Sequence, residues 1–186
     1  LYTCQHQIFE LSMKKPIFWE KAKKHLIKED KKLGNIIKDY PKDFLHSKSD
    51  PFYTLARSIV GQQISVQAAQ AVWNKFENKI KKVTPINTAN MHFMSMKSCG
   101  LSKQKVSYLK SLSDAFLNKR IAPKNWEKLS DEEIINELVQ IKGIGRWTAE
   151  MFLIFNLCRP DIFPADDLGL IKGICNCYNL KYPINK

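Results

Sequence analysis

The stretch LVQIKGIGRWTAEMFLIFNLCRPDIFPADDLG, residues 138–169, organises the chain. It places a short glycine-containing turn between two predicted helices, and a pair of aspartates, Asp166 and Asp167, after the second helix. Gly143 and Gly145 allow a sharp turn because glycine adopts positive φ without steric cost. The turn leads into a helix N-terminus, where backbone N–H groups and the helix dipole favour an anion. A phosphate group would fit there.

The residues alone leave two interpretations of this turn open. It is either a sequence-independent grip on a nucleic-acid backbone or an ordinary helix–helix connection with a glycine cap. Lys142 and Arg146 add positive charge and Thr148 adds a hydroxyl group. These side chains favour the first interpretation without excluding the second.

Helical spacing of apolar residues continues on both sides of the turn. Ser130 and Glu133 form a capping box, which predicts the start of the helix before it. The helix after it, residues 145–157, is apolar nearly all round, as in helices buried among other helices. No alternating strand pattern of useful length occurs, so the predicted fold class is all-α. Three further helices are predicted over residues 16–29, 31–40 and 88–96. Others are predicted to begin at Pro51, after Ser65 and before Val106, and a last one to run from near Asp166 toward Tyr178.

The chain has 186 residues and a formal net charge of +12. Its length suffices for one domain, or two small lobes, with a buried core. The charge suits a polyanionic partner, with nucleic acid first and an anionic membrane surface second. A lysine-rich solvated surface is the alternative explanation.

Several bulk features predict a cytoplasmic protein. No apolar run approaches the length of a membrane span, and no signal peptide is evident. Five cysteines are an odd number, which fits reduced thiols.

The turn and the acidic pair together resemble a known superfamily. They are similar to the helix–hairpin–helix DNA glycosylases with a Gly/Pro-rich loop and a catalytic aspartate, and within these to the DNA-3-methyladenine glycosylase II family. The similarity covers about residues 16–178. It is carried by Leu138-x-x-Ile-Lys-Gly-Ile-Gly-Arg-Trp-Thr-Ala149, Phe163-Pro-x-Asp-Asp167, Pro51-Phe-x-x-Leu-Ala-Arg57, Gly61-Gln-Gln-Ile-Ser65 with Ala68-Ala69, and Gly100-Leu-Ser-x-x-Lys105 with Tyr108-Leu109.

The resemblance implies a base-excision repair enzyme that hydrolyses the N-glycosidic bond of alkylated purines such as 3-methyladenine and leaves an abasic site. The catalytic aspartate of the family falls on Asp167. Its carboxylate would stabilise positive charge on the sugar, and would also be able to activate the attacking water. Asp166 would be its structural partner or a helix cap. A simple helix N-cap is the alternative role for either aspartate.

Trp147 stands where the strand-cutting relatives carry a lysine that forms a Schiff base. Tryptophan cannot form one, so the resemblance implies a monofunctional glycosylase without lyase activity. The indole would also line the base pocket and stack on a cationic purine. Plain core packing is the alternative role for this side chain.

The resemblance also implies the DNA contacts. An enzyme of this kind flips the base out of the duplex, and Gln62 or Gln63 would fill the gap. Further contacts would come from Ser65, Gly143, Gly145, Arg146 and Thr148. The backbone carbonyls of Val139, Ile141 and Ile144 would be able to hold a monovalent cation beside the phosphate, with no catalytic metal and no cofactor.

For the whole chain we expect an N-terminal extension with little structure over residues 1–12 and a glycosylase domain over residues 13–186. The domain would be compact and two-lobed, with its active site in the cleft between the lobes, and would act as a monomer on double-stranded DNA. The cysteine spacing predicts no iron–sulfur cluster. By this resemblance we expect the chain to lack the β-sheet lobe of larger relatives and the family's further C-terminal helix, either because this family member is short or because the sequence is truncated. A glycosylase for another lesion, a non-catalytic DNA-binding module and a lysine-rich adaptor for acidic proteins remain alternatives.

Overall fold

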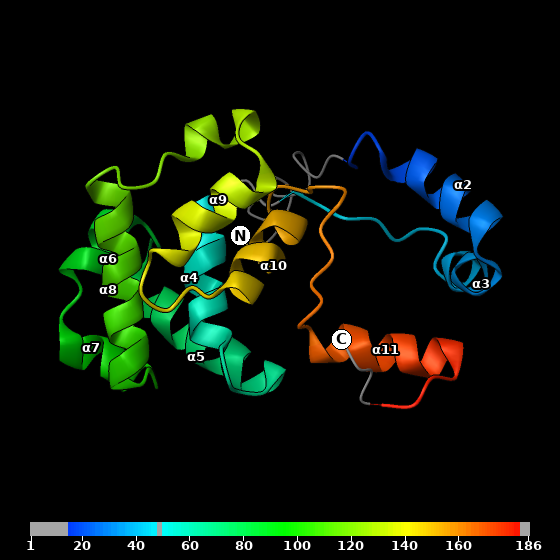
Figure 1. Ribbon diagram of the computed structural model, residues 1–186. Helices are drawn as coiled ribbons and strands as arrows, with labels where there is room; N and C mark the ends of the chain where they lie inside the picture. The colour runs from blue at the N-terminus through cyan, green and yellow to red at the C-terminus, as the bar shows by residue number, and fades with distance from the viewer. Residues whose placement is uncertain (1–14, 48–49, 183–186) are drawn as a thin grey trace, which may run out of the picture. The chain divides into compact units, whose positions relative to one another are not determined.

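The computed structural model describes residues 15–47 and 50–182, and all regular structure within these ranges is helical, with no β-strand. The predicted all-α fold class is therefore confirmed. The chain divides into two compact units (Figure 1). One is formed by residues 50–152, and the other by the described parts of residues 1–49 and 153–186. The extension predicted over residues 1–12 lies outside the described residues.

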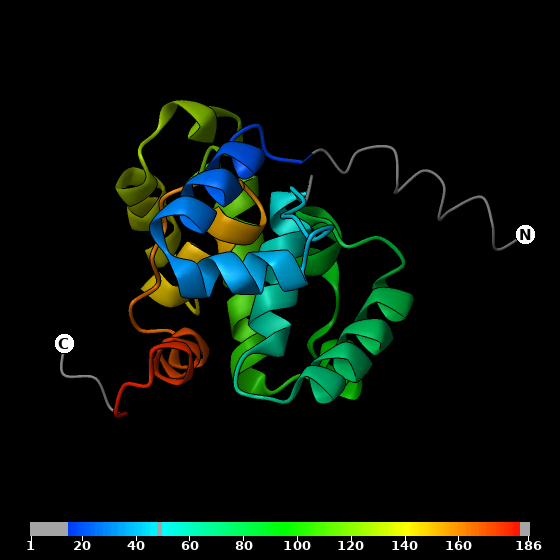
Figure 2. The same ribbon diagram turned by 90° about the vertical axis from the view of Figure 1, so that its right-hand side faces the viewer.

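The unit of residues 50–152 is built around α8 (Lys103–Leu117), which packs against α4, α6 and α7 (Figures 1 and 2). Apolar side chains at helical spacing, such as Leu109 and Leu112, are fully buried there. The other helices of this unit are α4 (Pro51–Gly61), α5 (Val66–Ile80), α6 (Pro85–Asn90), α7 (Phe93–Ser98), the 3-10 helix η1 (Pro123–Lys128), α9 (Asp131–Val139) and the start of α10 (Arg146–Phe155).

Side-chain caps explain why these helices begin where they do. The Ser65 hydroxyl accepts a hydrogen bond from Ala68 N–H at the start of α5. Ser130 and Glu133 form the predicted capping box at the start of α9. Each such cap satisfies a backbone N–H that the helix itself leaves unpaired.

The helix predicted over residues 88–96 is wrong, because two short helices, α6 and α7, occupy this region. Met91 and His92 are extended, and the His92 ring accepts a hydrogen bond from Met94 N–H at the start of α7. The Lys110 ammonium, from α8, donates to the carbonyls of Ala89 and Met91 and closes the end of α6. The break therefore depends on a side chain from another helix.

The other unit contains α2 (Trp19–Glu29) and α3 (Lys31–Asp39), which pack against each other, and α11 (Leu168–Tyr178). The Asp30 carboxylate accepts from Lys32 and Leu33 N–H and caps α3. It also accepts a hydrogen bond of 2.5 Å from the Tyr178 hydroxyl, so the link between α2 and α3 is joined to the end of α11.

Several predicted helix ends differ from the structure by one to three residues. α2 begins at Trp19 rather than at Pro16, whose carbonyl accepts from Trp19 N–H in a preceding turn. α10 ends at Phe155 rather than Leu157, because Cys158 adopts a φ of +52° and Arg159 N–H returns to the Leu153 carbonyl. α11 begins at Leu168, one position after its capping residue.

Four cysteines within the described residues are free thiols: Cys99, Cys158, Cys175 and Cys177. Within the same ranges no helix is both long and apolar enough to span a membrane. The cytoplasmic location stays a prediction.

Candidate functional site

The predicted hairpin consists of α9, a turn over residues 140–145, and α10. The turn is held by hydrogen bonds of 3.0 Å from Ile141 N–H to the Leu138 carbonyl and from Ile144 N–H to the Ile141 carbonyl. Ala149 N–H donates to the Gly145 carbonyl at 3.0 Å and opens the hydrogen-bond ladder of α10. The N–H groups of Gly145 and Arg146 precede that ladder, at the end of the helix where an anion is favoured.

The two glycines of the turn have different surroundings. Gly143 has a φ of +94°, and a Cβ added there would lie 2.2 Å from Tyr108 Cγ. A Cβ added at Gly145 would meet no atom of the described residues within 4 Å. Gly143 is thus required by the packing of the turn on Tyr108, whereas Gly145 leaves the surface open for a close approach.

A hollow of about 500 Å³ opens at this turn. It brings together most of the residues predicted to bind DNA with others for which no role was predicted. The first group is Gln62, Gln63, Gly143 and Gly145, with the carbonyl-bearing residues Val139, Ile141 and Ile144. The second group includes Ser102, Gln104, Lys105 and Tyr108.

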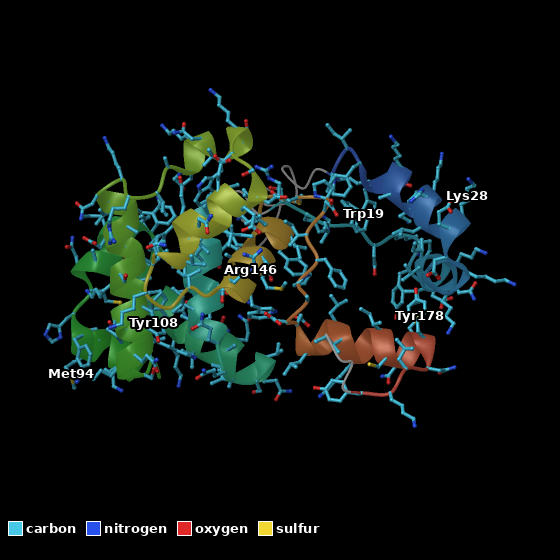
Figure 3. The ribbon with its side chains drawn as sticks, viewed as in Figure 1. Trp19, Lys28, Met94, Tyr108, Arg146 and Tyr178 are labelled. Carbon is cyan, nitrogen blue, oxygen red and sulfur yellow. The ribbon has the colours of Figure 1, made fainter. Side chains whose placement is uncertain are left out.

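Tyr108 projects from α8 toward the turn (Figure 3), and its hydroxyl accepts a hydrogen bond from the Gln104 amide. One helical turn earlier, the Lys105 ammonium donates to the Val60 carbonyl at 2.6 Å. Burial lowers the pKa of Lys105. Residues three apart lie on one helix face, so the spacing of Lys105 and Tyr108 was the available sequence signal for this support.

The two candidate glutamines are arranged differently. Gln62 is half-buried, and its amide donates a hydrogen bond of 2.9 Å to the Gly143 carbonyl. Gln63 is exposed and has a φ of +57°, in the left-handed region that non-glycine residues seldom adopt. Ser65 caps α5 through its hydroxyl. The structure thus ties Gln62 to the hairpin and presents Gln63 at the surface.

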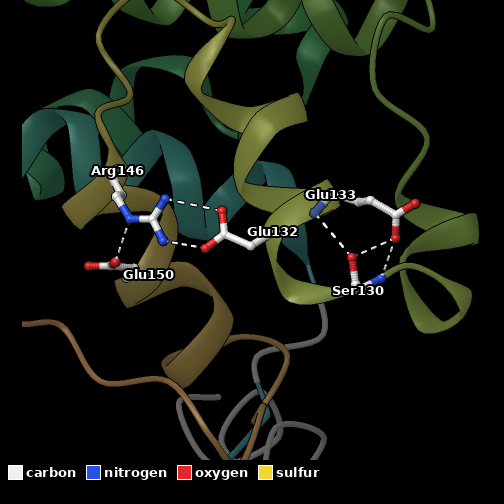
Figure 4. A network of polar contacts seen from close by, with 5 residues as sticks. All are labelled: Ser130, Glu132, Glu133, Arg146 and Glu150. Atoms are coloured by element: carbon white, nitrogen blue, oxygen red, sulfur yellow. Dashed lines mark hydrogen bonds and ion pairs between the residues drawn. The ribbon is translucent and has the colours of Figure 1, made fainter.

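The Arg146 guanidinium is shared between two carboxylates (Figure 4). Its Nε donates to Glu150 at 3.0 Å, and its two terminal nitrogens donate to the two carboxylate oxygens of Glu132. The Glu150 side chain is only 10% exposed, so Arg146 supplies the positive charge that a buried carboxylate needs. The hydrogen bond from Arg146 lowers the pKa of Glu132. This network joins the first turns of α9 and α10.

Thr148 and Trp147 differ in exposure. The Thr148 residue is 5% exposed, so its hydroxyl does not lie on an open surface, and the predicted contact of that hydroxyl with DNA needs correction. Its backbone N–H, in the first turn of α10, is the group that remains suited to a phosphate. Trp147 is 43% exposed, unlike the core tryptophans Trp73 and Trp126 at 1%. Plain core packing therefore does not describe Trp147.

Asp167 is the N-cap of α11. Its Oδ1 accepts from Leu170 N–H at 2.7 Å, and its backbone N–H donates to the Pro164 carbonyl at 3.0 Å. The N-cap role named as the alternative for either aspartate is thus observed for Asp167, and of the two roles expected for Asp166, structural partner or helix cap, the cap is not observed. The cap holds the Asp167 carboxylate at a helix N-terminus, where negative charge is stabilised. Asp167 and the hairpin belong to different units, so the cleft between lobes stays a prediction.

The predicted monovalent cation site remains untested. The Ile141 carbonyl already accepts one hydrogen bond, from Ile144 N–H, and a carbonyl oxygen has a second lone pair. Across residues 15–47 and 50–182, no three His, Cys, Asp or Glu side chains gather into a group that would hold a metal ion.

Comparison with known proteins gives consistent matches. Residues 56–184 match the HhH-GPD superfamily of base excision DNA repair proteins. The chain is 41% identical over 160 residues to DNA-3-methyladenine glycosylase 1 of Schizosaccharomyces pombe, covering 82% of this chain and 70% of that protein. It is 35% identical over 165 residues to an alkylbase DNA glycosidase-like protein of the same yeast, covering 85% of this chain and 78% of that one.

A solved structure also resembles this chain. It is the Schizosaccharomyces pombe 3-methyladenine DNA glycosylase in complex with abasic DNA, with a TM-score of 0.77 and 36% sequence identity. The match covers 87% of this chain and 82% of that one.

Proposed function

The chain belongs to the HhH-GPD superfamily of base excision DNA repair proteins, and from this membership we propose that it is a DNA glycosylase for alkylated purines of the 3-methyladenine type. The observation that carries the proposal is the 41% identity to a DNA-3-methyladenine glycosylase over 82% of this chain. The enzyme hydrolyses the N-glycosidic bond and leaves an abasic site in duplex DNA. It acts as a monomer.

Asp167 carries the chemistry in this proposal. Departure of the base leaves positive charge on the sugar, and a fixed carboxylate beside C1′ stabilises that charge. The hydrogen bond from Leu170 N–H to Asp167 Oδ1 supports this role, because it fixes the carboxylate relative to α11. The same carboxylate activates the attacking water.

The hairpin supplies the grip on the DNA backbone. Backbone N–H groups at the start of α10 bind a phosphate, and the open space at Gly145 lets the phosphate come close. Gln63, exposed in a left-handed conformation, fills the gap left by the flipped base. DNA binding thus combines a sequence-independent grip on the backbone with one side chain inserted into the duplex.

We further propose that the enzyme has no lyase activity. Trp147 occupies the position at which strand-cutting members of the superfamily carry the Schiff-base lysine, and an indole has no amine to attack C1′. Its exposure of 43% suits a side chain that stacks on a cationic base instead. Borohydride treatment during the reaction should trap no covalent protein–DNA adduct, and a trapped adduct would refute this part of the proposal.

A base-release assay on methylated duplex DNA tests the proposed function. The purified protein should release free 3-methyladenine and leave abasic sites that alkali cleaves. Parallel reactions with duplexes carrying 7-methylguanine, 1-methyladenine or hypoxanthine define the range of lesions. DNA binding without release of any base would instead indicate a non-catalytic DNA-binding module.

A further inference from the structure

The loop of residues 61–65 is fixed at three points that surround its exposed tip. The Val60 carbonyl, just before the loop, accepts from the Lys105 ammonium at 2.6 Å. Ser65, at the other end, caps α5. Between these ends the Gln62 amide donates to the Gly143 carbonyl at 2.9 Å. Gln63 is the exposed residue that follows this last contact.

One face of α8 supports both the loop and the hairpin turn. Lys105 reaches the carbonyl of Val60 at the end of α4, where a positive charge also interacts favourably with the helix dipole. Tyr108, three residues later, lies against Gly143. The loop and the turn are thus both supported by this face of α8, and Gln62 is the side chain that joins them directly.

We propose that Gln62 is a positioning residue that couples the hairpin's grip on a phosphate to the insertion of Gln63 into the duplex. The inference rests on the proposed function. The hydrogen bond ties Gln62 to the Gly143 carbonyl, and Gln63, with a φ of +57°, is the next residue along the chain from that tied neighbour. A hairpin seated on a phosphate therefore holds Gln63 at a set position toward the base stack.

Gln62→Met tests this coupling, because methionine keeps the length of the side chain but lacks the amide donor. Gln67→Met, which alters an exposed glutamine within α5, is the matched control. The readout is binding to two duplexes of one sequence, one undamaged and one with a tetrahydrofuran abasic-site analogue. Gln63 fills a gap only in the second duplex.

Gln62→Met should lower the preference for the abasic duplex by about tenfold. Its affinity for the undamaged duplex should stay within about twofold of the wild-type value, since the phosphate contacts remain. In a Gln63→Ala background, Gln62→Met should have no further effect on the preference, because the side chain that it positions is gone.

Three results would overturn the proposal. An equal loss on both duplexes would mean that Gln62 merely supports the hairpin. An unchanged preference would mean that the hydrogen bond positions nothing. Additive effects of the two substitutions would mean that Gln62 acts independently of Gln63. Failure of the proposed function itself would look different, since the wild-type protein would then release no base from methylated DNA.

Discussion

Gly143 lies so close to the ring of Tyr108 that a methyl group at Gly143 would sit 2.2 Å from Tyr108 Cγ. The turn that joins α9 to α10 is therefore seated on a side chain of α8. The carbonyl of the same glycine accepts the Gln62 amide, so three separate segments of the chain meet at one residue. Two residues later, Gly145 faces open space. The two glycines of this motif should consequently fail in different ways when substituted.

Gly143→Ala should destabilise the fold, and Gly145→Ala should weaken DNA binding. At Gly143 the methyl group combines a steric clash with a φ of +94°, which together cost about 2–4 kcal/mol of unfolding free energy. At Gly145 the fold is retained, but the methyl group blocks the approach of a phosphate and should lower affinity about tenfold. Urea unfolding and duplex titration of both variants separate the two effects. Similar losses of stability in both would contradict this division.

Glu132→Gln should make DNA binding more dependent on salt. The substitution weakens the hold on the Arg146 guanidinium, which is then available to a phosphate. One additional phosphate contact should steepen the slope of log K against log salt by about 0.9. Glu127→Gln makes the same change of charge at an exposed position in η1 and should leave the slope unchanged. Identical slopes for the two variants would contradict the claim that Glu132 keeps Arg146 away from a phosphate.

Gly169→Ala should impair catalysis, because its methyl group would lie 3.1 Å from Asp167 Oδ1 and displace the capping carboxylate. We expect a loss of about tenfold or more in the rate of base release. Gly173→Ala, in the same helix, meets no described atom within 4 Å and should preserve the rate while raising stability by about 0.5–1 kcal/mol. Single-turnover rates measure the contrast, and equal rates would show that the position of this carboxylate is unimportant.

Tyr178→Phe should lower stability within a defined pH window. The hydrogen bond to Asp30 raises the pKa of Tyr178 to about 12 and lowers the pKa of Asp30 below its usual 3.8. The contribution of this hydrogen bond to the stability of the fold is therefore full at neutral pH. It is lost as the pH rises from the usual tyrosine pKa of 10.0 through about 12, and as the pH falls from 3.8 through the lowered pKa of Asp30.

Denaturant unfolding at pH 7 and above pH 10 measures this effect, with Tyr182→Phe as the control at a tyrosine that is 51% exposed. The difference between wild type and Tyr178→Phe should shrink at alkaline pH, whereas Tyr182→Phe should resemble wild type throughout. A pH-independent difference would show that the bond to Asp30 is not its source.

Local signals predicted the helices well. The Ser130–Glu133 capping box, the Ser65 cap and the glycine turn all act within a few residues, so the sequence pattern contains them. The break between α6 and α7 depends on Lys110, which donates to carbonyls from another helix, and a local pattern does not contain that contact. The same limit explains why one helix was predicted there instead of two.

The sequence predicted which residues belong to the site, but not what most of their side chains contact. Gln62 was predicted as an alternative to Gln63, but its partner Gly143 lies 81 residues away in the sequence. Arg146 was predicted to contact DNA from its charge, whereas Glu132 and Glu150 determine how much of that charge is available. The burial of the Thr148 side chain likewise depends on packing that helical periodicity does not specify.

The central claim is that Asp167 performs the chemistry, and release of 3-methyladenine from methylated duplex DNA tests it most directly. Asp167→Asn keeps a side-chain oxygen that caps α11 but removes the charge, and Asp166→Asn is the control at the exposed neighbour. Asp167→Asn should slow release by at least about a hundredfold while binding duplex DNA as tightly as wild type, and Asp166→Asn should release the base at the wild-type rate. Wild-type release by Asp167→Asn would contradict the account.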